Sequence, residues 1–178
     1  VRWLAPILSF TAEEIWRELP APRPESVFLA TWHELPAAEG AIGAIDWQRL
    51  IALRTDVARE LERLRVAGEI GAPLQAELDV YCNDDQYPRL TALGDELRFL
   101  MITSKARVHR AEDAPAGAVV AASVPGGGVW LQVRPTTAAK CVRCWHHTDD
   151  VGTVAAHPEL CGRCVGNLAE PGETRRFA

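Results

Sequence analysis

The chain has 178 residues, a formal net charge of −5 and 48% hydrophobic residues. This length allows one or two domains with a buried core, and the composition is that of a soluble globular protein. The longest uncharged apolar stretch, from Gly117 to Val124, is too short to cross a bilayer, so we expect no membrane segment. No signal peptide is visible, which predicts a cytoplasmic location. The net negative charge gives no global sign of nucleic-acid binding.

The first expected helix covers residues 3–19. Its apolar residues follow helical spacing, with an interruption near Pro6. The segment Thr11–Glu14 fits a capping box for the second part of this helix, and Pro20 ends it. Because this pattern starts almost at Val1, without an initiating Met or a cap, we interpret the chain as a piece of a longer polypeptide.

A proline-rich stretch, residues 21–43, is expected to be connecting structure. Asp46 then caps the clearest helix of the sequence, which ends near Gly68. Its apolar positions are Trp47, Leu50, Ile51, Val57, Leu61 and Leu64. Its polar face combines arginines with fewer acids: Arg49, Arg54, Arg59, Arg63 and Arg65 against Asp56, Glu60 and Glu62. The sequence leaves two interpretations open, a solvated polar face or an arginine stripe that faces RNA.

After Pro73 the hydrophobic period changes from that of a helix to that of a strand. Cys82 falls within the first strand and is expected to be a buried, small apolar residue. The expected elements are strands at 74–82 and 102–109, a helix at 85–100, and a hairpin formed by 119–124 and 129–133. The sequence thus predicts a mixed α+β fold, in which a small α+β unit follows a helical one.

Near the end of the chain, cysteines form two C-x2-C pairs separated by 16 residues: Cys141 and Cys144, then Cys161 and Cys164. Two such knuckles complete the tetrahedral sulfur shell that structural zinc prefers. A closed shell leaves no position for substrate, so one structural zinc ion is expected. Iron in a rubredoxin-like site has the same ligands and stays open, whereas disulfides and a thioredoxin-like motif are disfavoured by paired knuckles in a cytosolic chain.

Other side chains near the knuckles carry alternative interpretations. Trp145 either packs over the small zinc module or offers an exposed platform for an unstacked RNA base. Arg143 and Arg163 would then reach phosphates. Since four thiolates fill the shell, the neighbouring histidines are expected to lie at the surface or beside the ligands: His146, His147 and His157.

The tail from Cys141 to Ala178, which begins CVRCWHHTDD and continues through CGRC, resembles the extreme C-terminus of bacterial isoleucyl-tRNA synthetases. So do the segments WLAPILSFTAEEIW, SVFLATW, GAPLQAELDVY and LTALGDELRFLMITS, in collinear order over essentially the whole chain. The tail is also similar to the finger of formamidopyrimidine-DNA glycosylases.

The resemblance implies three parts: a helical anticodon-binding domain at 1–72, a small α+β junction domain at 73–138 and a four-cysteine zinc module at 139–178. Together they would grip the anticodon stem-loop of the isoleucine tRNA. By resemblance, Arg143 and Trp145 match positions expected to meet the anticodon loop, and the remaining candidate RNA contacts are Arg163 and Arg54. The resemblance also suggests a monomeric parent enzyme.

Catalysis and editing would belong to upstream domains of the same chain, where the parent enzyme activates isoleucine with ATP and Mg²⁺ and transfers it to tRNA. Neither an HIGH-like nor a KMSKS-like motif is present, and Thr103–Lys105 is not a usable remnant of the latter. The glycines at 126–128 lack the Lys and the following Ser or Thr of a phosphate-binding loop. We therefore expect no catalytic residue and no activity from this chain alone.

Two alternatives come from other functional classes. The first is a DNA-binding fragment of a repair glycosylase, but that enzyme would need an N-terminal catalytic domain and a helix-two-turn-helix before its finger. The second is a stand-alone protein-interaction module stabilised by zinc.

Overall fold

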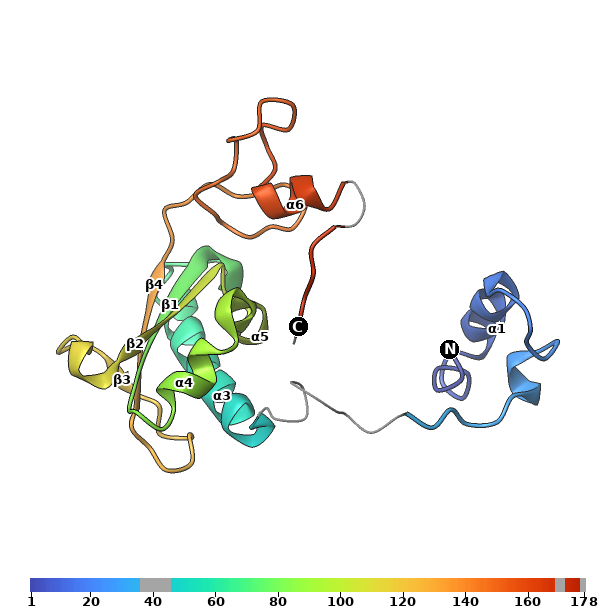
Figure 1. Ribbon diagram of the computed structural model, residues 1–178, viewed down its shortest axis with the longest axis horizontal. Coiled ribbons are helices and arrows are strands. Elements are labelled where there is room, and N and C mark those ends of the chain that lie inside the picture. The colour runs from blue at the N-terminus through green and yellow to red at the C-terminus, as the bar shows by residue number, and fades with distance from the viewer. Residues whose placement is uncertain (36–45, 169–171, 177–178) are drawn as a thin grey trace. The chain divides into compact units, whose positions relative to one another are not determined.

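A computed structural model describes residues 1–35, 46–168 and 172–176 (Figure 1). The chain forms two compact units, Val1–Glu39 and Gly40–Ala178. Part of the predicted connecting stretch, from residue 36 to residue 43, lies outside the described residues.

The first unit contains helix α1 (Ser9–Glu18) and the 3₁₀ turn η1 (Val27–Leu29). Its small core consists of Ala5, Ala12, Trp16 and Val27. The helix ends before Pro20, as predicted, with Leu19 as its C-cap. The predicted capping box at Thr11–Glu14 is wrong, because α1 already begins at Ser9. Within this segment the Glu13 carboxylate accepts hydrogen bonds at the start of η1, from the Ser26 hydroxyl at 2.9 Å and the Val27 amide at 3.0 Å.

In the second unit a four-stranded sheet has the strand order β2-β1-β4-β3. Strand β1 (Ala76–Cys82) lies parallel to β2 (Lys105–Arg110) and antiparallel to β4 (Val129–Pro135). The short strand β3 (Val119–Val120) pairs with β4, which confirms the predicted hairpin. The turn before β4 contains three glycines with positive φ, Gly126 to Gly128, and this left-handed backbone suits residues without a Cβ.

The parallel strands β1 and β2 need a crossover connection, which short helices supply on one face of the sheet. They are α4 (Tyr87–Thr91), the 3₁₀ turn η3 (Gly94–Glu96) and α5 (Leu97–Met101). A single helix was predicted over 85–100. The structure breaks it near Gly94, whose φ of +54° lies in the left-handed region. The predicted apolar spacing still holds, since Leu90, Leu93 and Leu97 are buried.

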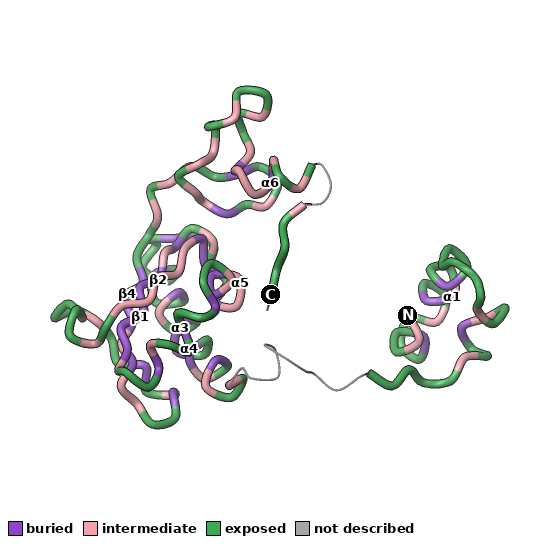
Figure 2. Tube along the Cα trace, viewed as in Figure 1, coloured by how far each residue is buried: buried purple, intermediate pink, exposed green. Residues whose placement is uncertain are grey.

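Helix α3 (Trp47–Val66) begins as predicted, because the Asp46 carboxylate accepts a hydrogen bond from the Arg49 amide at 3.1 Å. Its buried apolar residues belong to the same core as the inward-facing residues of β1. Figure 2 shows buried positions along both elements. Two of the predicted apolar positions lie outside this core, since Trp47 is 40% and Ile51 63% exposed. The α3 residues in the core are Leu50, Leu53, Val57, Leu61 and Leu64.

The mixed α+β fold class is confirmed. Cys82 is fully buried, as predicted, and burial raises the pKa of its thiol to about 11. The predicted domain boundaries at residues 72 and 138 stay a prediction. Helix α3, which precedes the first boundary, shares one core with the sheet that follows it. None of the helices in the described ranges has the length and apolar character needed to span a bilayer.

Candidate metal centre

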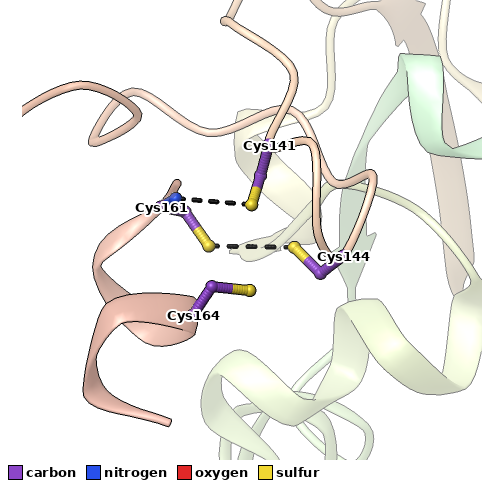
Figure 3. A group of neighbouring side chains, drawn as sticks. All are labelled: Cys141, Cys144, Cys161 and Cys164. Atoms are coloured by element: carbon purple, nitrogen blue, oxygen red, sulfur yellow. Dashed lines mark hydrogen bonds between the residues drawn. The ribbon is translucent and has the colours of Figure 1, made fainter. Parts of the chain in front are cut away.

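The four cysteines of the two knuckles meet at one point of the second unit (Figure 3). Cys141 and Cys144 lie on a tight loop, closed by a hydrogen bond from the Cys141 amide to the His146 carbonyl at 2.9 Å. Cys161 and Cys164 lie at the start of the short helix α6 (Gly162–Gly166), with Cys161 as its N-cap. The structure therefore brings together all four predicted metal-ligating residues.

The geometry of the sulfur atoms fits a zinc ion. All four lie within 4.8 Å of one another, and the sulfurs of Cys144 and Cys161 are 3.7 Å apart. A tetrahedral shell with Zn–S bonds of about 2.3 Å places its sulfurs about 3.8 Å apart. The Cys161 amide also donates to the Cys141 sulfur at 3.4 Å, an interaction that favours a thiolate. These residues could hold one ion in a closed shell, whose role would be to stabilise the fold.

Burial and hydrogen bonds from backbone N–H groups act in opposite directions on the pKa values of these thiols. Burial alone would raise the pKa of Cys141, but backbone N–H groups of Cys144, Cys161 and Arg143 outweigh it and lower this pKa to about 6. At Cys161 burial dominates and raises the pKa to about 12. A divalent cation that replaces the protons of such a buried cluster gives the thiolates their compensating charge.

The Trp145 side chain, on the first knuckle, is 62% exposed. Its backbone has a φ of +67°, rare for a bulky residue, and its amide donates to the Cys141 carbonyl at 2.9 Å. The ammonium of Lys140 lies 5.2 Å from the centroid of the ring. The first knuckle thus holds an aromatic face toward solvent beside a cation.

The candidate arginines differ in their surroundings. Arg143 and Arg54 are exposed, and neither has a carboxylate partner within the described part of the chain. The Arg163 side chain is partly buried, pairs with Glu173 at 2.9 Å and lies 5.1 Å from the Phe99 ring. Burial would lower the pKa of Arg163, but the Cys144 sulfur and the Glu173 charge raise it. The structure therefore places Arg163 in an internal contact and leaves Arg54 open to solvent. The Arg143 side chain is exposed but also interacts with the Cys164 sulfur, where it opposes the burial that raises the pKa of that thiol.

The zinc module contacts the sheet through polar groups that the sequence did not indicate. The His147 amide donates to the Ser104 hydroxyl at 2.7 Å, and the Lys105 ammonium pairs with Asp149 at 3.0 Å. His146 is buried, and its ring meets the Phe99 ring edge-on. No local pattern distinguished Phe99 from the other apolar residues at 97–101, because its partners lie in a distant segment.

Comparison with known proteins agrees with this geometry. The model for the anticodon-binding domain of tRNA ligase matches residues 1–81, and the model for the zinc finger found in FPG and IleRS matches residues 139–166. The isoleucine–tRNA ligase of Nitrosococcus oceani is 51% identical over 181 residues, which cover 100% of this chain and 19% of that protein. The ligases of Thioalkalivibrio sulfidiphilus and Aeromonas salmonicida are 50% and 47% identical, with the same coverage of each chain.

The chain matches the C-terminal part of bacterial isoleucine–tRNA ligases along its whole length. It spans about a fifth of the length of these relatives. The predicted resemblance is therefore confirmed, and the zinc-finger match together with the sulfur geometry confirms that the C-terminal module is of a structural zinc-binding type. The glycosylase alternative is not favoured, because residues 1–81 match a tRNA-ligase domain.

Proposed function

We propose that this chain is the tRNA-recognition region of an isoleucine–tRNA ligase and binds the anticodon stem-loop of the isoleucine tRNA. In the parent enzyme, upstream domains would use ATP and Mg²⁺ to charge isoleucine onto that tRNA, with editing also upstream. This region would supply binding and no catalytic group. We expect it to act in the cytoplasm as part of a monomer.

The observation that carries the proposal is the exposed ring of Trp145 on the first cysteine knuckle, where its backbone has a positive φ. An aromatic face held toward solvent can stack on an unpaired base, the mode by which proteins read single-stranded RNA loops. Lys140 and Arg143 lie on the same knuckle and are exposed, so their charges suit the adjacent phosphates. The anticodon-binding match over residues 1–81 supports the same partner.

The zinc ion would hold this platform in place. The proposed ligands are the thiolates of Cys141, Cys144, Cys161 and Cys164, because their sulfurs form one cluster. The backbone of the first knuckle reverses direction within a few residues. Without the metal, only a few hydrogen bonds would maintain that turn. Loss of zinc should therefore weaken RNA binding through loss of the knuckle's shape.

The proposal can be tested by measuring the affinity of the zinc-loaded chain for isoleucine tRNA and for a non-cognate tRNA, before and after the zinc is removed by a chelator. Tighter binding to isoleucine tRNA that disappears on chelation is the expected result. Equal affinity for both tRNAs, or no binding with zinc confirmed in the sample, would contradict the proposal for this chain. A full-length ligase with Trp145→Ala at the corresponding position would then show whether recognition needs the other domains.

A further inference from the structure

Phe99, on α5, is the residue around which the zinc module meets the helices of the sheet domain. Three guanidinium groups approach its ring, with their Cζ atoms at 4.3 Å for Arg175, 4.4 Å for Arg98 and 5.1 Å for Arg163. The ring of His146 meets the same side chain edge-on, at 5.4 Å between centroids and an interplanar angle of 76°. Three of these partners, His146, Arg163 and Arg175, belong to the zinc module, and the first two lie within two residues of a cysteine of the cluster.

Carboxylates hold these cations in place. Arg98, which is 7% exposed, bonds to both oxygens of Asp95 at 2.9 Å. Glu173 accepts from Arg163 at 2.9 Å and from Arg175 at 2.8 Å. A guanidinium that is partly removed from water interacts more strongly with an aromatic face than an exposed one. The contact between these guanidinium groups and Phe99 is therefore directional and depends on the aromatic ring.

On its other side α5 faces α3. Met101 and Ile102, at the C-terminal end of α5, line a pocket of ~170 Å³ together with Arg54 and Arg65 of α3. Helix α5 thus connects the two regions with candidate RNA contacts, the helix that carries Arg54 and the knuckle that carries Trp145.

We propose that Phe99 is a positioning residue for RNA binding, which fixes the Trp145 knuckle relative to α3 by holding His146 and Arg163. This inference rests on the proposed function, since it concerns how the same surface is arranged. One stem-loop can contact Trp145 and Arg54 at the same time only when the distance between these two side chains matches the dimensions of the RNA. A module already held in that arrangement loses less conformational freedom on binding than a loosely attached one.

The first measurement concerns the attachment of the module in the full zinc-loaded chain. Phe99→Leu removes the aromatic face and keeps an apolar side chain, whereas Phe99→Tyr keeps the ring. The readout is amide hydrogen exchange at His147, whose N–H bonds to Ser104 across the contact. We expect faster exchange at His147 in Phe99→Leu and wild-type exchange in Phe99→Tyr. The Cys161 amide should stay protected in both, because its partner Cys141 lies within the module.

The second measurement is affinity for isoleucine tRNA. We expect Phe99→Leu to raise the Kd by about threefold to tenfold, the size of a lost cation–π contact, and Phe99→Tyr to change it less than about twofold. In a double-mutant cycle, Trp145→Ala should weaken binding less in the Phe99→Leu background than in the wild type. A purely structural role would give additive losses.

Different failures have different meanings. Unchanged His147 exchange in Phe99→Leu would overturn the role of Phe99 in attachment. Faster exchange with unchanged tRNA affinity, or additive losses in the cycle, would overturn its role in RNA binding and leave the proposed function intact. If the wild-type chain fails to bind tRNA, both the proposed function and the positioning role are overturned, and the exchange data then describe a structural contact only.

Discussion

The ammonium of Lys140 lies 5.2 Å from the centroid of the Trp145 ring, and both side chains project from the first zinc knuckle. This pairing leaves much of the indole face open to solvent, since Trp145 is among the most exposed large apolar residues of the second unit. A base stacked on that ring would bring its phosphate within reach of a cation already in place. The pair therefore combines the two elements of single-strand recognition, an aromatic face and a neighbouring positive charge.

Replacement of Trp145 tests whether the ring contacts RNA. Trp145→Ala should weaken binding to isoleucine tRNA by about 1–3 kcal/mol, the range for loss of one base–aromatic stack. Zinc content should remain one ion per chain, because the side chain is exposed and the proposed ligands are the four cysteines. Val142→Ala is the matched control, since Val142 is an exposed apolar residue of the same knuckle. Equal losses in the two variants would assign the effect to the shape of the knuckle.

Removal of one metal ligand tests the zinc assignment. Cys144→Ser should abolish tight zinc binding and expose the module's amides to exchange, while amides of β1 keep their protection, because the sheet has its own core. Cys82→Ala is the control: this buried thiol lies in β1, so zinc should stay and the free energy of unfolding should fall by about 1 kcal/mol. Zinc analysis and hydrogen exchange give both readouts. Retention of tight zinc by Cys144→Ser would show that a histidine completes the shell.

Much of the metal site and part of the fold could be predicted from the sequence because both depend on local spacing. The two C-x2-C pairs specify a sulfur cluster wherever the chain folds, and Asp46 marks the start of α3 because an N-cap acts within one helical turn. The alternation of apolar and polar residues at 76–82 likewise identified β1, because successive side chains of a strand point to opposite faces; its burial on both faces was not visible in that pattern.

The errors arose where distant residues decide the outcome. Thr11 and Glu14 have the spacing of a capping box, yet the helix begins at Ser9, and the Glu13 carboxylate between them bonds to the Ser26 hydroxyl of a separate turn. Ile51 has helical spacing with the buried residues of α3, but the sheet covers the side of the helix that carries Leu53. The contacts of Phe99 depend on how the zinc module folds back on α5, and no periodic pattern encodes that.

A buried carboxylate on the other face of the sheet predicts a pH dependence. Asp79 is 3% exposed and accepts hydrogen bonds from Arg107 at 2.6 Å, from His109 at 2.8 Å and from Arg134. Burial alone would raise its pKa, but these hydrogen bonds and the charges of Arg107 and Arg134 lower it to about 2. Because the folded state lowers this pKa, Asp79 stabilises the fold above pH ~4, and that stabilisation is lost as the pH falls toward 2.

Replacement of Asp79 should therefore have a pH-dependent effect on stability. Asp79→Asn should lower the free energy of unfolding by about 2 kcal/mol at pH 7, and the difference from the wild type should shrink near pH 2, where the wild-type carboxyl is also protonated. Urea unfolding at both pH values measures this, and the comparison cancels the loss of zinc in acid. Asp84→Asn is the control, since Asp84 is exposed and pairs with Arg110 at the surface. A difference that stays constant with pH would contradict the assignment.

The arginines of α3 offer a test between the two interpretations of that helix. Arg63 pairs with Glu60 at 2.9 Å and Arg65 with Glu62 at 2.7 Å, so their charges are already compensated. Arg54 has no carboxylate partner among the residues that the structure describes, and it lines the pocket that Ile102 also lines. An uncompensated cation that meets a phosphate releases a counterion on binding, and affinity then falls with salt.

Arg54→Ala should therefore weaken tRNA binding at low salt and reduce the slope of log K against log salt concentration by about one. Arg63→Ala, an exposed arginine of the same helix, should leave both the affinity and the slope unchanged because its charge is already paired. Titrations at several salt concentrations separate the two variants. If neither arginine changes the slope, the polar face of α3 is a solvated surface stabilised by its own ion pairs. If both variants change the slope equally, the RNA responds to the net charge of the helix. The lack of a carboxylate partner would then give Arg54 no special role in binding.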